Sequence, residues 1–344
     1  MKLSTLAFAL ASLAVAGAAQ AAGPYSLPLR GNDLPADQRY STFVHTSGIQ
    51  AEGKDIGALR NTSGANWSKL KADGADPKVL DNWLIYGKPV YAMADGKIFS
   101  CWRNAPQNVP GSYLPEYEAK KISGGGNHLW VLQDDGVKTL YAHMQPGSVP
   151  PELCPHNAAL MSGTNKDEDA VADGVRVKAG QMIGRVGNSG ASEGGPHLHV
   201  HMQLDGKALP MTFSRGATTP FANGKTDIDG PWTRLAGKEL PKATILFWPP
   251  HKVGDYTFNG VQAANYQRLF DHMADSGMMP SLISCASNGA TYSSQWVPSQ
   301  GDWRSHHGMS ASEAAAKQAL YTAQGYKRTS TYTCGSANVA VWRK

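Results

Sequence analysis

The sequence lacks the features of several common protein classes. No histidine is followed by glutamate, which excludes the His-Glu-x-x-His zinc helix of many metallopeptidases. Arginines do not cluster and lysines are scattered, so a net charge of +5 gives no case for nucleic-acid binding. After residue 21 no apolar run approaches the length that spans a bilayer, and we expect no transmembrane segment in the mature chain.

The first 21 residues are an exception to this composition. Lys2 precedes an apolar run from Leu6 to Ala18, and Ala19-Gln20-Ala21 has the small-x-small pattern of a cleavage site. We interpret residues 1–21 as a signal peptide cut after Ala21, because the run is too short for a membrane anchor. This predicts a secreted protein, either periplasmic or extracellular.

Cysteine is scarce, and its four copies are the even number expected of a secreted protein with disulfides. Cys101, Cys154, Cys285 and Cys334 allow three pairings, and no two of them have the close spacing of a zinc site. The order of the domains favours the pairs Cys101–Cys154 and Cys285–Cys334, with each bond inside one domain. Glycine and proline are abundant instead, at 37 and 21 residues, and favour a turn-rich β protein.

The segment 195–202 has the strongest chemical signal in the chain. Three apolar residues alternate there with three histidines, which is the two-residue period of a strand with one apolar face. The opposite face then carries His197, His199 and His201 in a row. Imidazole is the commonest metal ligand in proteins and also transfers protons, so this face predicts a metal or acid–base site.

The approach to this strand consists of short strands punctuated by glycine turns. The ordered motif Gly180-Gln-x-Ile-Gly-x-Val-Gly187-x-Ser-Gly190, followed by Gly195-Pro-His-Leu-His199, resembles the lysostaphin-type (LytM-like) zinc metallopeptidases. Members of that family cut peptide bonds in bacterial cell walls. The resemblance implies a mainly β fold, an antiparallel sheet with inserted loops over residues 22–242, and Zn2+ as the cofactor.

The resemblance also implies roles for individual residues. Asp55 and His199 match zinc ligands of the family. His143, which closes the segment Tyr-Ala-His, and His197 match its pair of catalytic histidines, which orient or deprotonate the water and stabilise the oxyanion. His201 stands where relatives often carry an acidic residue, and we expect it to face solvent rather than to support the site.

The first zinc ligand departs from the family pattern, because Ala51 replaces the histidine that normally stands four residues before the aspartate. Some relatives carry this histidine further upstream, and we therefore predict His45 as the third ligand. An unbroken strand would hold His45 roughly 33 Å from Asp55, so the chain must fold back between residues 46 and 53. Glu52, turned inward by a bulge, is the next candidate.

A different unit begins after residue 242 and contains an internal repeat. Glycine, cysteine and tryptophan recur at nearly constant spacing in two copies, each with an amphipathic helical segment followed by strands. The second helix begins at Ser310, which forms a predicted capping box with Glu313. The repeat resembles a bacterial tandem-repeat module found beside secreted serine hydrolases. We expect residues 243–344 to form a small α+β accessory domain, with His272, His306 and His307 facing solvent.

Together these features predict a secreted zinc metalloendopeptidase acting on peptidoglycan cross-bridges or glycine-rich peptides. The alternative is a non-catalytic cell-wall binding or activator protein with a degenerate zinc site, which the Ala51 departure supports. The presence of both catalytic histidines and of Asp55 and His199 favours the enzyme. Zinc analysis distinguishes the two, since only the enzyme requires about one ion per chain.

Overall fold

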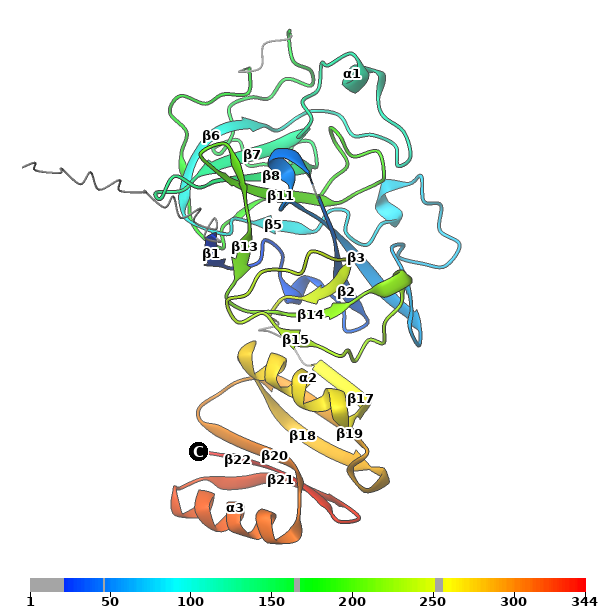
Figure 1. Cartoon of the computed structure of the whole chain (residues 1–344), viewed down its shortest axis with the longest axis vertical. Helices are drawn as coiled ribbons and strands as arrows, with labels where there is room; N and C mark the ends of the chain where they lie inside the picture. The colour runs from blue at the N-terminus through cyan, green and yellow to red at the C-terminus, as the bar shows by residue number, and fades with distance from the viewer. Residues whose placement is uncertain (1–21, 46, 164–167, 251–255) are drawn as a thin grey trace, which may run out of the picture.

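The structure, a computed structural model, describes residues 22–45, 47–163, 168–250 and 256–344. The signal peptide predicted for residues 1–21 lies outside them. Two bodies follow one another along the long axis of the molecule: a larger one dominated by strands and a smaller one that carries two helices (Figure 1). Within the described ranges, no helix is long and apolar enough to cross a membrane.

The larger body is built on one extensive sheet. Its strands are β2 (Gln38–Val44), β3 (Lys54–Ser63), β4 (Asn66–Ser68), β6 (Gly96–Trp102), β7 (Asn127–Leu132), β8 (Lys138–Met144), β9 (Arg176–Val177), β11 (Leu198–Leu204), β12 (Lys207–Leu209), β14 (Ala217–Pro220), β15 (Thr233–Arg234) and β16 (Ile245–Trp248). Their order is β15-β14-β16-β2-β3-β11-β8-β7-β6-β9, with β4 paired to β3 and β12 to β11. Neighbours in this order are antiparallel, which confirms the predicted mainly β, antiparallel architecture.

Smaller elements surround this sheet. They are β1 (Ala22–Tyr25), which pairs with β13 (Met211–Phe213), β5 (Pro89–Tyr91), which pairs with β10 (Met182–Arg185), the short helix α1 (Pro115–Glu118), and single turns of 3-10 helix at η1 (Gly31–Asp33), η2 (Gly48–Gln50), η3 (Leu80–Asn82) and η4 (Ala222–Gly224). The apolar residues of β11, Leu198, Val200 and Met202, are at most 1% exposed and enter the main core. Their alternation therefore fixes which face of β11 turns away from the core.

The smaller body contains two copies of one strand–helix–strand–strand unit. The first copy is β17 (Tyr256–Gln262), α2 (Ala263–Asp275), β18 (Met278–Ala286), η5 (Ser287–Gly289) and β19 (Thr291–Pro298), and the second is β20 (Trp303–Met309), α3 (Ala311–Ala323), β21 (Lys327–Cys334) and β22 (Ala337–Arg343). Both sheets place their last strand in the middle, in the orders β17-β19-β18 and β20-β22-β21. The capping box predicted for Ser310 and Glu313 is present at the start of α3.

Two disulfides are present, with the pairing that domain order favoured. Cys101 on β6 is bonded to Cys154 in the long loop after β8. Cys285 on β18 is bonded to Cys334 on β21 and so joins the two repeats. Each bond stays within one body of the molecule.

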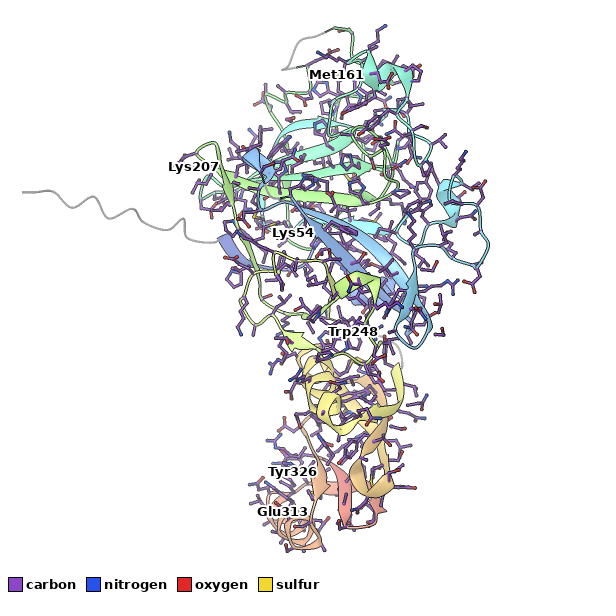
Figure 2. All side chains as sticks on the ribbon, turned by 45° about the vertical axis from the view of Figure 1, so that its right-hand side comes forward. Lys54, Met161, Lys207, Trp248, Glu313 and Tyr326 are labelled. Atoms are coloured by element: carbon purple, nitrogen blue, oxygen red, sulfur yellow. A yellow bond between two sulfur atoms is a disulfide. The ribbon has the colours of Figure 1, made fainter. Side chains whose placement is uncertain are left out.

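The junction between the two bodies lies later in the sequence than residue 243, where we expected the accessory domain to begin. The strand β16 follows that point, yet it pairs with β2 and β14 inside the large sheet. We therefore propose a boundary between residues 248 and 256. Trp248, the last residue of β16, lies where the two bodies meet (Figure 2) and is fully buried.

The histidines of the repeats were expected to face solvent, and the structure corrects this. His272 on α2 is 1% exposed because its ring lies 4.2 Å from the ring of Trp248 across the junction. His306 is half-buried and stacks on Tyr321. His307 is half-buried among aromatic rings of the first repeat. His306 is covered from within its own repeat, whereas His272 and His307 are covered by docking on the sheet and on the first repeat. Sequence patterns within one element carry no signal of such docking.

Candidate metal centre

The predicted fold-back before Asp55 is a β-hairpin. Strand β2 ends at residue 44, η2 turns the chain, and β3 returns antiparallel with Phe43 opposite Asp55. The backbone N–H of His45 donates to the carbonyl of Gly53 at 3.1 Å, which closes the loop. The hairpin therefore places the imidazole of His45 beside the carboxylate of Asp55, with Nε2 and Oδ1 3.0 Å apart.

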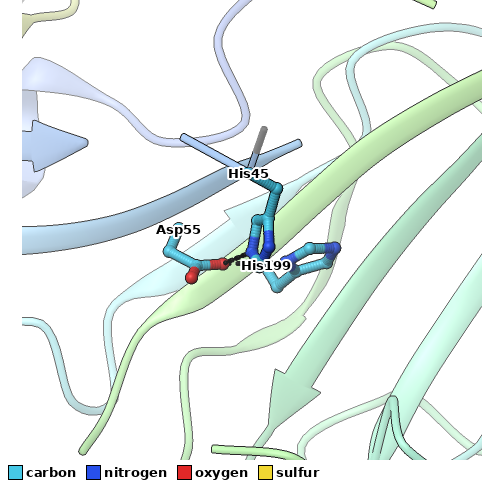
Figure 3. Close-up of side chains that lie close together, drawn as sticks. All are labelled: His45, Asp55 and His199. Carbon is cyan, nitrogen blue, oxygen red and sulfur yellow. Dashed lines mark hydrogen bonds and ion pairs between the residues drawn. The ribbon is translucent and has the colours of Figure 1, made fainter. Parts of the chain in front are cut away.

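The third member of the cluster comes from the neighbouring strand. His199 on β11 is directly opposite Asp55 on β3, and its Nδ1 lies 2.7 Å from Asp55 Oδ1. One candidate ligand atom from each of His45, Asp55 and His199 lies within 4.8 Å of the others, and the three side chains converge on one point (Figure 3). This is a set of two imidazole nitrogens and one carboxylate oxygen that could bind a metal ion.

The electrostatics of the cluster centre on Asp55. Burial alone would raise the pKa of this carboxyl group, but hydrogen bonds with His199 and His45 outweigh burial and hold the pKa far below its usual range. The same hydrogen bond to Asp55 raises the pKa of His45. The carboxylate is therefore anionic over the whole physiological range and available to a cation.

His143 reaches the same face by an irregularity in β8. Ala142 is opposite His199, so regular alternation would turn His143 to the other side of the sheet. The register of β7 and β8 shifts at this point, and His143 has a positive φ of 66°. This bulge redirects the side chain, as bulges near active sites do. The ring of His143 then lies 4.7 Å from that of His197.

His143 and His197 have matching hydrogen-bond arrangements. The Nδ1 of His143 lies 2.8 Å from the carbonyl of Ser189, and the Nδ1 of His197 lies 2.9 Å from the carbonyl of Gly195. A carbonyl only accepts, so Nδ1 carries the proton in both rings and Nε2 has a free lone pair when the ring is neutral. Burial lowers the pKa of both imidazoles, strongly for His143, and favours this neutral form.

The expectation about His201 is corrected, and the alternative ligand Glu52 has another partner. His201 does not face solvent: it is 2% exposed, and burial lowers its pKa to about 3. The segment that contains η2 and Gly53 packs over it. This close approach is possible because Gly53 has no side chain, which would otherwise contact His199 and His201. Glu52, the second candidate ligand, is paired with Lys242 rather than directed at Asp55.

A groove of about 700 Å³ runs over the cluster. Its walls come from the β2–β3 hairpin, the turn before β11, and two segments whose role the sequence did not indicate. Trp83, from the insertion after β4, packs beneath Gly195, and Tyr113 comes from the loop after β6. At the rim, Phe43 is 59% exposed. The insertions are polar and irregular in sequence, so only the packed structure identifies their aromatic residues as groove walls.

Comparison with protein families gives two matches. The model described as peptidase family M23 matches residues 158–210, which include His197 and His199 but not His45, Asp55 or His143. The model described as a polyglycine hydrolase-like structural repeat matches residues 257–299 and 300–343, which confirms the predicted tandem repeat.

Curated relatives resemble only part of the chain. The DD-carboxypeptidase/endopeptidase Mpg of Neisseria meningitidis serogroup B is 27% identical over 176 residues, which cover 46% of this chain and 31% of that protein. The glycyl-glycine endopeptidase ALE-1 of Staphylococcus capitis is 28% identical over 170 residues, which cover 49% and 32%. The chain thus spans about a third of the length of these relatives.

Among solved structures, the catalytic domain of lysostaphin from Staphylococcus simulans is 22% identical, covers 49% of this chain and 80% of that one, and has a TM-score of 0.24. The glycine-rich motif and the M23 family match fall on the larger body, and the repeat matches fall on the smaller one. The chain is therefore similar to peptidase family M23 over residues 158–210 and to polyglycine hydrolase-like structural repeats over residues 257–299 and 300–343.

Proposed function

We propose that this protein is a secreted zinc metalloendopeptidase that hydrolyses peptide bonds in peptidoglycan cross-bridges or glycine-rich peptides. One observation carries the proposal: His45, Asp55 and His199 converge at the base of a groove, with His143 and His197 beside them. The names of the relatives add support, since one describes a DD-carboxypeptidase/endopeptidase and the other a glycyl-glycine endopeptidase.

The donor set of the cluster suits zinc. Two nitrogens and one carboxylate oxygen are ligands that Zn2+ accepts, and three protein ligands leave one of four tetrahedral positions open, as in catalytic sites. Their proximity within 4.8 Å requires only small side-chain adjustments to surround one ion. When bound, zinc polarises a scissile carbonyl and increases the acidity of water.

The two remaining histidines would handle protons. Each keeps Nδ1–H on a backbone carbonyl, so the unprotonated Nε2 is the atom that accepts a proton from water and later returns it to the leaving amine. The carbonyl bonds also fix both rings against rotation. The positive φ of His143 is a constrained backbone conformation of the kind found at catalytic positions.

The groove can hold a peptide segment, because its volume of about 700 Å³ is within the usual range for ligand sites. Several glycines line it, among them Gly57, Gly124 and Gly194, and they leave its walls open to a substrate backbone. An oxidising, extracytoplasmic location agrees with the two disulfides, because such bonds persist outside the reducing cytosol.

The test uses two single substitutions in the purified full chain. His45→Ala should abolish both zinc binding and peptide hydrolysis, because it removes one of three ligands. His143→Ala should reduce hydrolysis by about 10²–10⁴-fold, the usual contribution of a general acid or base, while zinc stays bound. Metal content is measured by atomic absorption and hydrolysis on pentaglycine-bridged peptidoglycan.

The matched control is His156→Ala, since His156 belongs to the same body but bonds the carbonyl of Ala170 away from the cluster. It should retain both zinc and activity. Full zinc and full activity in His45→Ala would show that the ligand assignment is wrong. A wild-type chain without zinc or hydrolysis would instead favour a non-catalytic binding protein.

A further inference from the structure

The face of β11 that carries His199 continues into a hydrogen-bonded row, which is buried at His201 and half-buried at Gln203. Nδ1 of His201 lies 2.8 Å from Nε2 of His199, and its ring meets the ring of Trp130 edge-on at 5.1 Å. Gln203 follows, with its side-chain amide 3.3 Å from Nε2 of His201. These three residues occupy alternate positions of one strand, so the pleat itself aligns them.

The proton positions in this row follow from the cluster. His199 directs Nδ1 at Asp55, and a metal ion bound there requires a lone pair on that nitrogen. The single ring proton of His199 is then on Nε2, where the nearest acceptor is Nδ1 of His201. Nε2–H of His201 in turn needs an acceptor. Rotation of the Gln203 side-chain amide by 180° exchanges its nitrogen and oxygen and places the oxygen next to Nε2 of His201.

We propose that His201 is a positioning residue that accepts the Nε2–H of His199 and thereby fixes the nitrogen of His199 that faces the metal ion. This inference rests on the proposed zinc site. A histidine ligand is oriented by the partner of its second nitrogen, and loss of such a partner typically weakens metal binding about 10–100-fold.

The nature of the acceptor has a second consequence. The described contacts of His201 are with His199, Gln203 and Trp130, none of which is a carboxylate. A neutral imidazole withdraws the ligand's proton less strongly than a carboxylate does, so it makes His199 a weaker electron donor. An acidic side chain at position 201 should therefore bind zinc more tightly than the native histidine.

The test compares zinc affinity among variants of the full chain. His201→Leu removes the acceptor but keeps an apolar side chain, whereas His201→Asn presents a carbonyl oxygen near the position of Nδ1. We expect the dissociation constant of zinc, from chelator competition, to rise about 10–100-fold in His201→Leu and less than about threefold in His201→Asn. The visible spectrum of the cobalt-substituted protein should change in His201→Leu and stay native-like in His201→Asn.

The matched control is His128→Asn. His128 is as buried as His201, at 2% exposed, but it bonds Asp169 and does not belong to the row. Its substitution should leave zinc affinity unchanged. Unfolding midpoints of the zinc-free proteins show whether each variant folds, and if His201→Leu does not, His201→Asp provides the comparison through its expected tighter binding.

Equal affinity in wild type and His201→Leu would overturn the inference, and so would equal losses in His201→Leu and His201→Asn, because packing alone would then explain the effect. If His201→Leu does not fold and only His201→Asp can be compared, a zinc dissociation constant of His201→Asp no lower than that of wild type overturns the inference. In each case the wild-type chain still binds zinc and the proposed function stands. A wild-type chain that binds no zinc overturns both.

Discussion

Gly195 shapes the groove at the scale of a single residue. It has a φ of 118°, and a methyl group added there would lie 2.3 Å from the ring of Trp83. We expect Gly195→Ala to lower the free energy of unfolding by about 2–4 kcal/mol, through backbone strain and overpacking. Denaturant unfolding measures this loss, and peptide hydrolysis should fall as well because the turn supports His197.

The neighbouring glycine is the control for this prediction. A methyl group at Gly194 would meet no atom within 4 Å, so Gly194→Ala should change the free energy of unfolding by less than about 1 kcal/mol. Equal losses in the two variants would mean that the contact with Trp83 is not the cause.

Residue positions in the site were predictable to different degrees. The face shared by His197, His199 and His201 followed from local alternation, because the apolar side of a strand must enter the core. The orientation of His143 did not, since a bulge depends on the register of β8 with β7, a partner strand elsewhere in the chain. Burial of His201 was missed for a related reason: the covering loop η2 comes from far upstream.

At the scale of elements, the second repeat docks through His307 on β20. The ring lies 4.8 Å from Tyr266 and 5.7 Å from Phe270 on α2, and 5.0 Å from Tyr292 on β19. Burial, with a smaller contribution from His306, lowers the pKa of His307 to about 4, although Asp271 opposes the shift.

This packing predicts an acid-sensitive contact between the repeats. An unfolded histidine has a pKa of about 6.5, so between pH 6.5 and 4 the unfolded chain binds more protons than the folded one. The contribution of His307 to stability is therefore complete above pH 6.5 and is lost as the pH falls toward 4, by up to about 3 kcal/mol. Urea unfolding of wild type and His307→Gln at both pH values measures it.

The variant should show a smaller loss between neutral and acidic pH than the wild type, because the titrating group is gone while the rest of the chain is unchanged. The same pH dependence in both proteins would contradict the assignment to His307.

Helices were more predictable than sheets at this scale. The amphipathic segment at 266–273 and the cap at Ser310 indicated α2 and α3, because helix signals are local in sequence. The order of the large sheet was not predictable, since β16 pairs with β2 across some two hundred residues. Such pairing is decided by the packing of the whole domain, and for this reason we propose a boundary later than residue 243.

At the scale of the whole molecule, the two bodies share a core. The ring of Trp248 lies within 5.7 Å of the rings of Tyr256 and Phe258 in the first repeat. The guanidinium of Arg39 lies 4.1 Å from the centre of the indole ring, and Arg39 also donates to the hydroxyl of Tyr256. The first repeat is therefore packed on the larger body through buried contacts rather than joined by a flexible linker.

We expect Trp248→Ala to destabilise the molecule by about 3–5 kcal/mol, the usual cost of truncating a buried large aromatic residue. Loss of the shared core should also split a single calorimetric unfolding transition into two. Tyr332→Ala, at a side chain 46% exposed, should leave the transition intact. A wild type with two transitions would contradict the coupling.

The spread of the proposed metal ligands along the chain determines when the candidate centre can form. His45 and Asp55 belong to one hairpin, but His199 is 144 positions beyond Asp55. A chain synthesised from its N-terminus therefore carries only two of the three ligands until β11 has emerged. Until β16 follows, β2 also remains an open edge that other strands could join. The proposed site is thus completed late in biogenesis, and premature termination between the hairpin and β11 would release an aggregation-prone fragment that lacks His199.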